Sequence, residues 1–248
     1  MLDFAAEIRT IWQISNTELA SISFAASNDV CGTIPRLRRD NRLEIEVRCN
    51  PSKVDDILFH EGAHVYLFHL KYPPCRFISI TGTDFFTMPI DFVAEFYATK
   101  LELQRRYQST SSRIRELGRR LENATTRIPL QAVDYAPQRG AGDIAIQAAF
   151  CSYLCDEWSL LELRRNSESI MAGALHKVRN AYTEVINALR QIPHLPDDRS
   201  FNDSEIQAIV AVLQASFDRL YDGIWRIQAP VGFFGLSAAA SAALLLAD

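Results

Sequence analysis

The most informative run of apolar residues extends from Ile57 to Leu70. Its apolar positions are too closely spaced for a helix with a broad wet face, so the pattern predicts a helix that is covered on most sides. Ser52-Lys53-Val54-Asp55 has the form of a capping box at its start, and Pro73-Pro74 ends it. The predicted helix spans about 19 residues, close to 28 Å at about 1.5 Å per residue.

Strand patterns precede this helix. Residues 42–49 alternate polar and apolar side chains, which is typical of a strand with one face in water. Asp40-Asn41 is typical of a turn, so residues 30–38 and 42–49 are predicted to form a hairpin. A further short strand is expected around Ile22-Ser23-Phe24, and all the strand signal lies within residues 1–108.

The chain after Ser109 is predicted to be helical, because apolar residues recur at steps of three and four. The expected helices lie near residues 111–127, 143–165, 167–192 and 203–227. The expected fold class is α+β and mostly α, with a small antiparallel sheet packed on the buried helix and a helical bundle after it. The chain is divided into a core at residues 1–108, a helical region at 109–228 and an apolar tail at 229–248.

Composition and charge add few constraints. A net charge of −4 gives no global reason to expect nucleic acid as a partner. Arginines cluster in two places, but aromatic residues do not interleave with them, so a solvated basic face is favoured over a nucleic-acid surface. The two groups are Arg36, Arg38, Arg39, Arg42 and Arg48 in the hairpin, and Arg113, Arg115, Arg119, Arg120 and Arg127 after it.

Several features favour a cytoplasmic protein. The start of the chain lacks the pattern of a secretion signal, and five cysteines without C-x-x-C spacing indicate reduced thiols rather than a disulfide framework. The tail at 229–248 carries no charge before Asp248. A docked helix or a loose tail is favoured there, because Pro230 and many small residues interrupt it; the alternative is a membrane anchor.

The buried helix contains His60-Glu61-Gly62-Ala63-His64, an H-E-x-x-H pattern. Two imidazoles four residues apart project from one face, so both can reach one metal ion. The glutamate between them points to the side, where it can act on water instead of binding the metal. Polar side chains in so apolar a helix need partners, and a cation is the simplest one. The motif predicts one Zn²⁺ per chain, held by His60 and His64, with Glu61 as the catalytic base.

A catalytic zinc needs a third protein ligand. The next predicted helix carries Asp91 and Glu95 one turn apart on one face. Here the chain resembles the gluzincin metallopeptidases, in which H-E-x-x-H is followed by a glutamate in an E-x-x-A or E-x-x-A-D setting on a second helix. Within that group it is similar to the small intracellular phage-immunity and IrrE-like members, over residues 42–108.

The resemblance leaves two alignments open. Glu95-Phe96-Tyr97-Ala98 supplies the expected glutamate and alanine, although Thr99 replaces the usual acid. In the other alignment Asp91 is the ligand and Glu95 is the acid that follows. Glu95 is favoured because its side chain reaches farther, and the remaining carboxylate would then orient a histidine.

The resemblance implies a hydrolase that cuts peptide bonds with a zinc-activated water whose proton Glu61 takes. A peptide or protein substrate could lie extended along the edge of the Leu43–Cys49 strand. Four residues are candidate donors to the developing oxyanion: His69, Tyr97, Tyr135 and His176. The alternative function is a zinc-containing regulatory or partner-binding protein with little or no peptidase activity.

Overall fold

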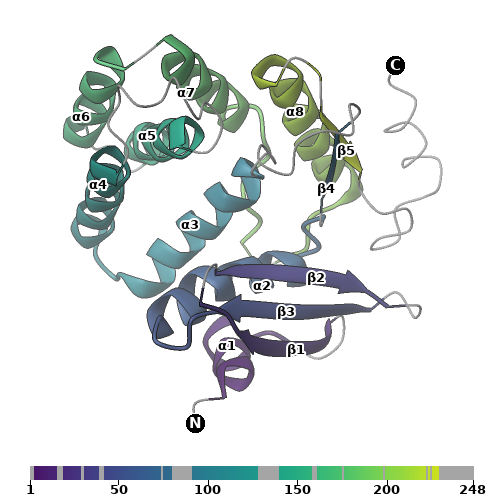
Figure 1. The fold of residues 1–248 in the computed structure, drawn as a ribbon. Coiled ribbons are helices and arrows are strands. Elements are labelled where there is room, and N and C mark those ends of the chain that lie inside the picture. The colour runs from purple at the N-terminus through teal and green to yellow at the C-terminus, as the bar shows by residue number, and fades with distance from the viewer. Residues whose placement is uncertain are drawn as a thin grey trace.

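The computed structural model describes residues 3–15, 19–28, 31–38, 42–73, 75–79, 91–127, 140–157, 161–174, 176–197, 199–221, 223 and 225–228. The fold is α+β and mostly helical, as the sequence predicts. A three-stranded sheet with α1 and α2 against it forms one end of the molecule (Figure 1). From there α3 leads to the helices α4 to α8.

The sheet contains β1 (Leu19–Ala26), β2 (Gly32–Leu37) and β3 (Leu43–Cys49) in the order β1-β3-β2. The antiparallel pairing of β2 with β3 confirms the predicted hairpin, and β1 confirms the strand expected near residue 23. β1 runs parallel to β3, however, so the sheet is mixed and the prediction of an antiparallel sheet is wrong. Because β3 is the central strand, the expectation that it offers a free edge to a peptide is also wrong.

The central position of β3 in the sheet agrees with the burial of one of its faces. Leu43, Ile45, Val47 and Cys49 alternate along it and are all buried. The opposite face of the hairpin is charged and partly exposed. There Arg36 and Arg48 bind Glu46, and Arg38 binds Glu44, so these arginines of the first group have acidic partners within the sheet.

The predicted buried helix is present, but it begins differently. It contains a π-helical turn, η1 (Asp56–Glu61), which continues as α2 (Gly62–His69). At the expected capping box, the backbone N–H and the hydroxyl of Ser52 both donate to the Asn50 side chain. The helix is nevertheless stopped before the two prolines, as predicted.

The N-terminal helix α1 (Phe4–Trp12) has no counterpart among the predicted elements. Its last residue, Trp12, donates its indole N–H to the Leu58 carbonyl of η1 at 2.9 Å. The Gly62 N–H binds the carbonyl of Ile57, five residues back, which is the π-helical pattern. α1 therefore supports the turn that carries the first histidine of the motif.

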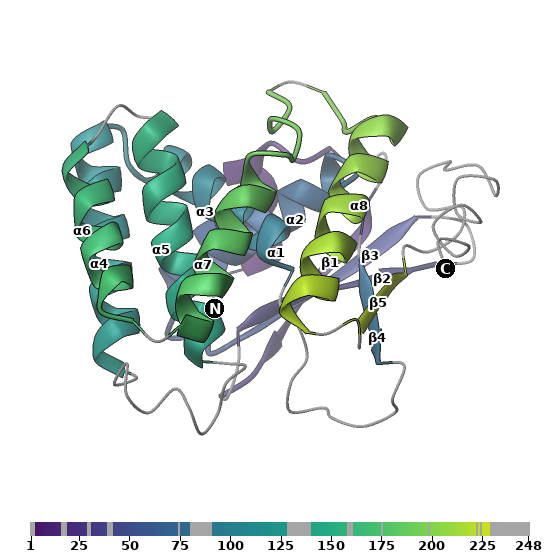
Figure 2. The same cartoon turned by 90° about the horizontal axis from the view of Figure 1, so that it is seen from above.

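The later helices are α3 (Phe92–Arg106), α4 (Thr110–Arg127), α5 (Gly140–Glu157), α6 (Leu161–Ala172), α7 (His176–Leu189) and α8 (Asp203–Leu220). α4 and the start of α8 agree with the prediction, and Asn202 with Glu205 forms a capping box. The two helices expected at 143–165 and 167–192 are replaced by three, because α6 is a separate helix that ends just before Gly173. α5 packs against α4, α6 and α7, and α7 packs against α8 (Figure 2).

A second sheet pairs β4 (Arg76–Ser79) with β5 (Trp225–Gln228) in antiparallel fashion. The helix expected at 203–227 therefore ends at Leu220, and the expectation that all strands lie within residues 1–108 is wrong. Trp225 and Ile227, two residues apart, are both buried, so burial of one strand face outweighs the helical spacing of the sequence. The end of the helical region thus returns to the core.

Cys31 and Cys49 form a disulfide that joins the start of β2 to the end of β3. The expectation of reduced thiols is wrong for this pair. Cys75 and Cys151 keep their thiols, and Cys151 is buried beside the Leu117 carbonyl, as expected of a core residue.

No helix among the described residues is long and apolar enough to cross a membrane. The apolar tail at 229–248, together with Arg39 and Tyr135, lies outside the described residues.

Candidate metal centre

The two imidazoles of the motif and one carboxylate of α3 converge. The Nε2 atom of His60 lies 3.5 Å from Oε2 of Glu95, and the Nε2 atom of His64 lies 3.4 Å from Oε1 of Glu95. One ligand atom from each of the three residues lies within 4.8 Å of the other two. Predicted ligands from two separate helices are therefore arranged around one point.

The donor set and its spacing fit Zn²⁺. Two imidazole nitrogens and one carboxylate oxygen are a ligand set of catalytic zinc, which keeps its fourth position open. Ligand atoms about 2.1 Å from a tetrahedral ion stand about 3.4 Å from one another. The two nitrogen–oxygen distances, each to a different oxygen of Glu95, are 3.4 and 3.5 Å, and all three ligand atoms lie within 4.8 Å of one another. The three side chains also border a cavity of about 460 Å³, so a substrate can approach them.

Asp91, the alternative ligand, has other partners. Its Oδ1 atom accepts the Ala94 N–H at 2.9 Å as the N-cap of α3, and the Tyr72 hydroxyl lies 2.9 and 3.0 Å from the two carboxylate oxygens. Burial raises the pKa of Asp91 to about 6, although both hydrogen bonds oppose the rise. Asp91 therefore fixes the start of α3, one turn before Glu95, and it belongs neither to the cluster of possible ligand atoms nor to the cavity lining.

Glu61 lines the same cavity and is 4% exposed. Its Oε2 atom accepts a hydrogen bond of 2.7 Å from the Thr33 hydroxyl on β2. Sequence reasoning missed Thr33, which lies 28 residues before Glu61 and belongs to no motif. The hydrogen bond holds the carboxylate at the cavity wall in one orientation, which a general base needs.

A second carboxylate that sequence reasoning missed lies behind His60. The Nδ1 atom of His60 is 3.0 Å from Oε2 of Glu102 on α3, and Glu102 is 1% exposed. Glu102 follows Glu95 by seven residues, or about two helical turns, so both face the motif helix. That spacing is a signal in the sequence, but the E-x-x-A-D pattern of the gluzincins that the chain resembles expects its acid at position 99, where a threonine stands. Metal-binding histidines commonly donate their other N–H to such a carboxylate.

The charges of the centre are strongly coupled. Burial lowers the pKa of His60, but its contacts with Glu102 and Glu95 outweigh this effect and raise the pKa to about 10. Burial raises the pKa of both carboxylates, yet His64 and His60 bring that of Glu95 far below its usual value. His60 and Arg120 likewise lower the pKa of Glu102 to about 2. Two ionised carboxylates therefore flank His60, and this arrangement attracts positive charge.

The predicted oxyanion donors do not line this cavity where the structure describes them. The Tyr97 hydroxyl donates to the Pro193 carbonyl at 2.5 Å. His176 lies on the surface of α7, 3.3 Å from the Asn180 side chain, and His69 is the last residue of α2. The described residues that border the cavity are Cys31, Gly32, Thr33, His60, Glu61, His64 and Glu95.

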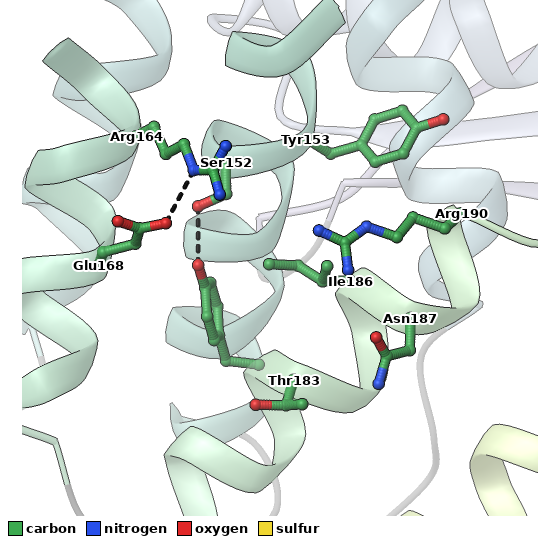
Figure 3. A pocket seen from close by; sticks show the side chains of 9 residues that line it. Ser152, Tyr153, Arg164, Glu168, Thr183, Ile186, Asn187 and Arg190 are labelled. Atoms are coloured by element: carbon green, nitrogen blue, oxygen red, sulfur yellow. Dashed lines mark hydrogen bonds and ion pairs between the residues drawn. The ribbon is translucent and has the colours of Figure 1, made fainter. Parts of the chain in front are cut away.

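A second cavity, of about 210 Å³, lies between α5, α6 and α7 (Figure 3). The hydroxyls of Ser152 and Tyr182 lie 2.8 Å apart, and Arg164 donates to Glu168 at 2.8 Å. The described residues that line it include neither histidine nor cysteine. The Ser152 hydroxyl also lies 2.5 Å from that of Ser167, so Ser152 on α5 contacts both α6 and α7, whereas the Arg164–Glu168 pair lies within α6. These contacts do not resemble a metal or nucleophile site.

We compared the chain with models of protein families, with curated proteins and with solved structures, and none of the three comparisons returned a match.

Proposed function

We propose that the protein is a zinc-dependent metallopeptidase that hydrolyses peptide bonds. His60, His64 and Glu95 are its metal ligands, with one ion per chain, and Glu61 is its general base. One observation carries the proposal: the H-E-x-x-H imidazoles and Glu95 meet at a cavity, with their ligand atoms within 4.8 Å of one another and nitrogen–oxygen distances of 3.4 and 3.5 Å, close to those around a tetrahedral zinc ion. A cytoplasmic location and the absence of a nucleic-acid partner stay predictions.

Each side chain of the centre has a defined task in this mechanism. Bound Zn²⁺ supplies Lewis acidity, which polarises the scissile carbonyl and makes water nucleophilic near neutral pH. Glu61 takes a proton from that water on the carboxylate oxygen that Thr33 leaves free, and passes it to the leaving amine. Glu102 holds Nδ1 of His60, so that Nε2 faces the ligand point.

The edge strand β2 is suited to hold an extended substrate. The Arg38 N–H binds the Arg42 carbonyl at 2.9 Å, and bonded pairs alternate along an antiparallel ladder. The backbone groups of Thr33 and Pro35 therefore point away from β3, towards the side of β2 that no described strand covers. The backbone of Thr33 offers both an N–H donor and a C=O acceptor to a neighbouring strand. Pro35 offers only its C=O, because proline lacks an N–H. A peptide would add as a strand at Thr33, beside Glu61.

The substitution Glu61→Gln tests the mechanism. Glutamine keeps the shape of the side chain and an oxygen for Thr33, but it cannot take a proton. The variant should keep one zinc per chain by elemental analysis and lose at least about 10²-fold in cleavage rate. Cleavage is measured on a mixture of peptides by mass spectrometry. If Glu61→Gln cuts at the parental rate, the peptidase mechanism is wrong.

The same experiment separates the alternative function. A parent chain that holds one zinc but cuts no peptide in the mixture would support a zinc-containing regulatory or partner-binding protein. A parent chain that holds no zinc, even after incubation with the metal, would contradict both functions.

A further inference from the structure

A row of buried charges connects His60 to the helical region. Glu102 on α3 contacts His60 Nδ1 through Oε2, and its other oxygen, Oε1, accepts a hydrogen bond from Arg120 on α4. Arg120 also donates through Nε to Oε1 of Glu116, one turn earlier on α4, at 3.0 Å. The side chains of Glu102 and Arg120 are 1% and 20% exposed. A helix outside the predicted core therefore reaches the neighbour of a metal ligand.

The two oxygens of Glu102 have different partners, and this fixes the plane of the carboxylate. A buried carboxylate needs a cationic or hydrogen-bonding partner, and Arg120 is the closest guanidinium; Arg106 on α3 is 3.8 Å away. With Arg120 on Oε1, Oε2 is directed at the His60 Nδ1–H. That contact fixes the ring orientation of His60 and keeps Nε2, the nitrogen nearest Glu95, as the one at which a metal would take the place of a proton.

We propose that α4 is a structural part of the metal centre and that Arg120 is a positioning residue, which sets metal affinity by holding Glu102 against His60. The inference rests on the proposed function only in that His60 binds the metal, and it does not require peptide hydrolysis. A displacement of α4 would release Glu102 and loosen the ring of His60. The helical region thereby has a physical means of controlling the centre.

The neighbouring arginine provides a matched control. Arg119 also binds Glu116, through hydrogen bonds of 2.6 and 2.8 Å, but its side chain is 59% exposed. Among the described residues Glu116 is its only ion-pair partner, and it does not reach Glu102. Arg119→Met and Arg120→Met therefore remove the same charge from adjacent positions of one helix, and only the second removes the contact to the centre.

The test measures the zinc affinity of the full chain by competition with a chromophoric chelator. Arg120→Met should bind zinc about 10–100-fold more weakly than the parent, the usual effect of losing a partner behind a metal-bound histidine. The zinc affinity of Arg119→Met should differ from that of the parent by less than about twofold, because an exposed ion pair contributes little. The visible spectrum of the Co²⁺ form should change in Arg120→Met alone, because that spectrum reports ligand geometry and a general loss of stability would not alter it.

The outcomes separate this inference from the proposed function. Equal zinc affinity of Arg120→Met and Arg119→Met, with tight binding by the parent, would overturn the role of α4 and leave the metallopeptidase proposal intact. A parent without zinc affinity would contradict both.

Two milder variants keep the test decisive if Arg120→Met does not fold. Arg120→Lys keeps the charge but loses the planar guanidinium, so its zinc affinity should lie between those of the parent and of Arg120→Met. Glu116→Gln weakens the hold on Arg120 without touching Glu102, and it should lower zinc affinity by a smaller factor. Parental affinity in both variants would refute the inference.

Discussion

Gly62, the residue after Glu61 of the motif, lies against the buried indole of Trp12. A Cβ atom added at Gly62 would lie 2.3 Å from Nε1 and 2.9 Å from Cδ1 of that indole. Trp12 is 1% exposed, donates to the Leu58 carbonyl and has the Arg105 guanidinium 5.2 Å from its ring centre. The indole therefore cannot move aside without losing a hydrogen bond or displacing its neighbours. We predict that Gly62→Ala destabilises the fold.

The sign of this prediction is informative, because the backbone alone predicts the opposite. Gly62 has helical dihedral angles, φ −59° and ψ −35°, and replacing glycine with alanine inside a helix normally gains about 1 kcal/mol. Overpacking of a core typically costs about 1–3 kcal/mol, and loss of the indole hydrogen bond costs about 1 kcal/mol more. The expected balance is a loss of about 1–3 kcal/mol in the free energy of unfolding.

Urea unfolding followed by circular dichroism measures this difference. A double-mutant cycle with Trp12→Ala provides the control, because alanine has no ring atoms to clash with the added Cβ. Gly62→Ala should be neutral or stabilising in the Trp12→Ala background, with a coupling energy of at least about 1 kcal/mol. A Gly62→Ala single variant as stable as the parent would refute the packing of α1 against the motif helix.

Two further predictions concern residues beside the ligands. Burial raises the pKa of Asp91 to about 6 from an ordinary 3.8, so between these pH values the folded chain keeps a proton that the unfolded chain has lost, and stability falls as the pH rises. Asn at position 91 can still cap α3, so in urea unfolding Asp91→Asn should have a free energy of unfolding up to about 3 kcal/mol above that of the parent above pH 6, and the same value below pH 4. Asp91→Asn should also keep the zinc affinity of the parent, whereas Glu95→Gln should lose it. The opposite result would make Asp91 the ligand. Thr33→Val should lower kcat roughly tenfold and leave zinc affinity unchanged, because the Glu61 carboxylate loses a hydrogen bond. Thr33→Ser keeps the hydroxyl and should keep the parental kcat. A Thr33→Val variant with parental kcat would remove Thr33 from the mechanism.

Local patterns were enough to predict part of this centre. The positions of His60, Glu61 and His64 follow from helical spacing alone, and the reach of a glutamate favoured Glu95 over Asp91. The hairpin followed from the alternation of residues 42–49, which reflects one buried face. All of these features depend on residues within one element or in consecutive elements, where the period of the backbone determines which side chains share a face.

Other features depend on contacts that no local pattern encodes. β1 pairs in parallel with β3, the strand whose alternate residues Leu43, Ile45, Val47 and Cys49 are all buried, and residues 225–228 form a strand because β4 offers a partner. The helical spacing at 203–227 was real, but it was overridden beyond Leu220 by burial against a distant segment. In each case the competing structures have similar local energies, and tertiary packing decides between them.

The side chains that hold the motif in place also come from distant parts of the chain, so local patterns did not predict them. Trp12 binds the backbone of the motif helix, Thr33 binds Glu61, and Glu102 with Arg120 holds His60. These four side chains come from α1, β2, α3 and α4, so the five-residue motif is oriented by elements from both sides of the predicted boundary at residue 108. A metal ligand must be held within a fraction of an ångström, and a solvated helix surface cannot do this. The helical region therefore cannot be treated as an appendage to the core, because removing α4 leaves the Glu102 carboxylate buried without Arg120, its closest cationic partner beyond His60.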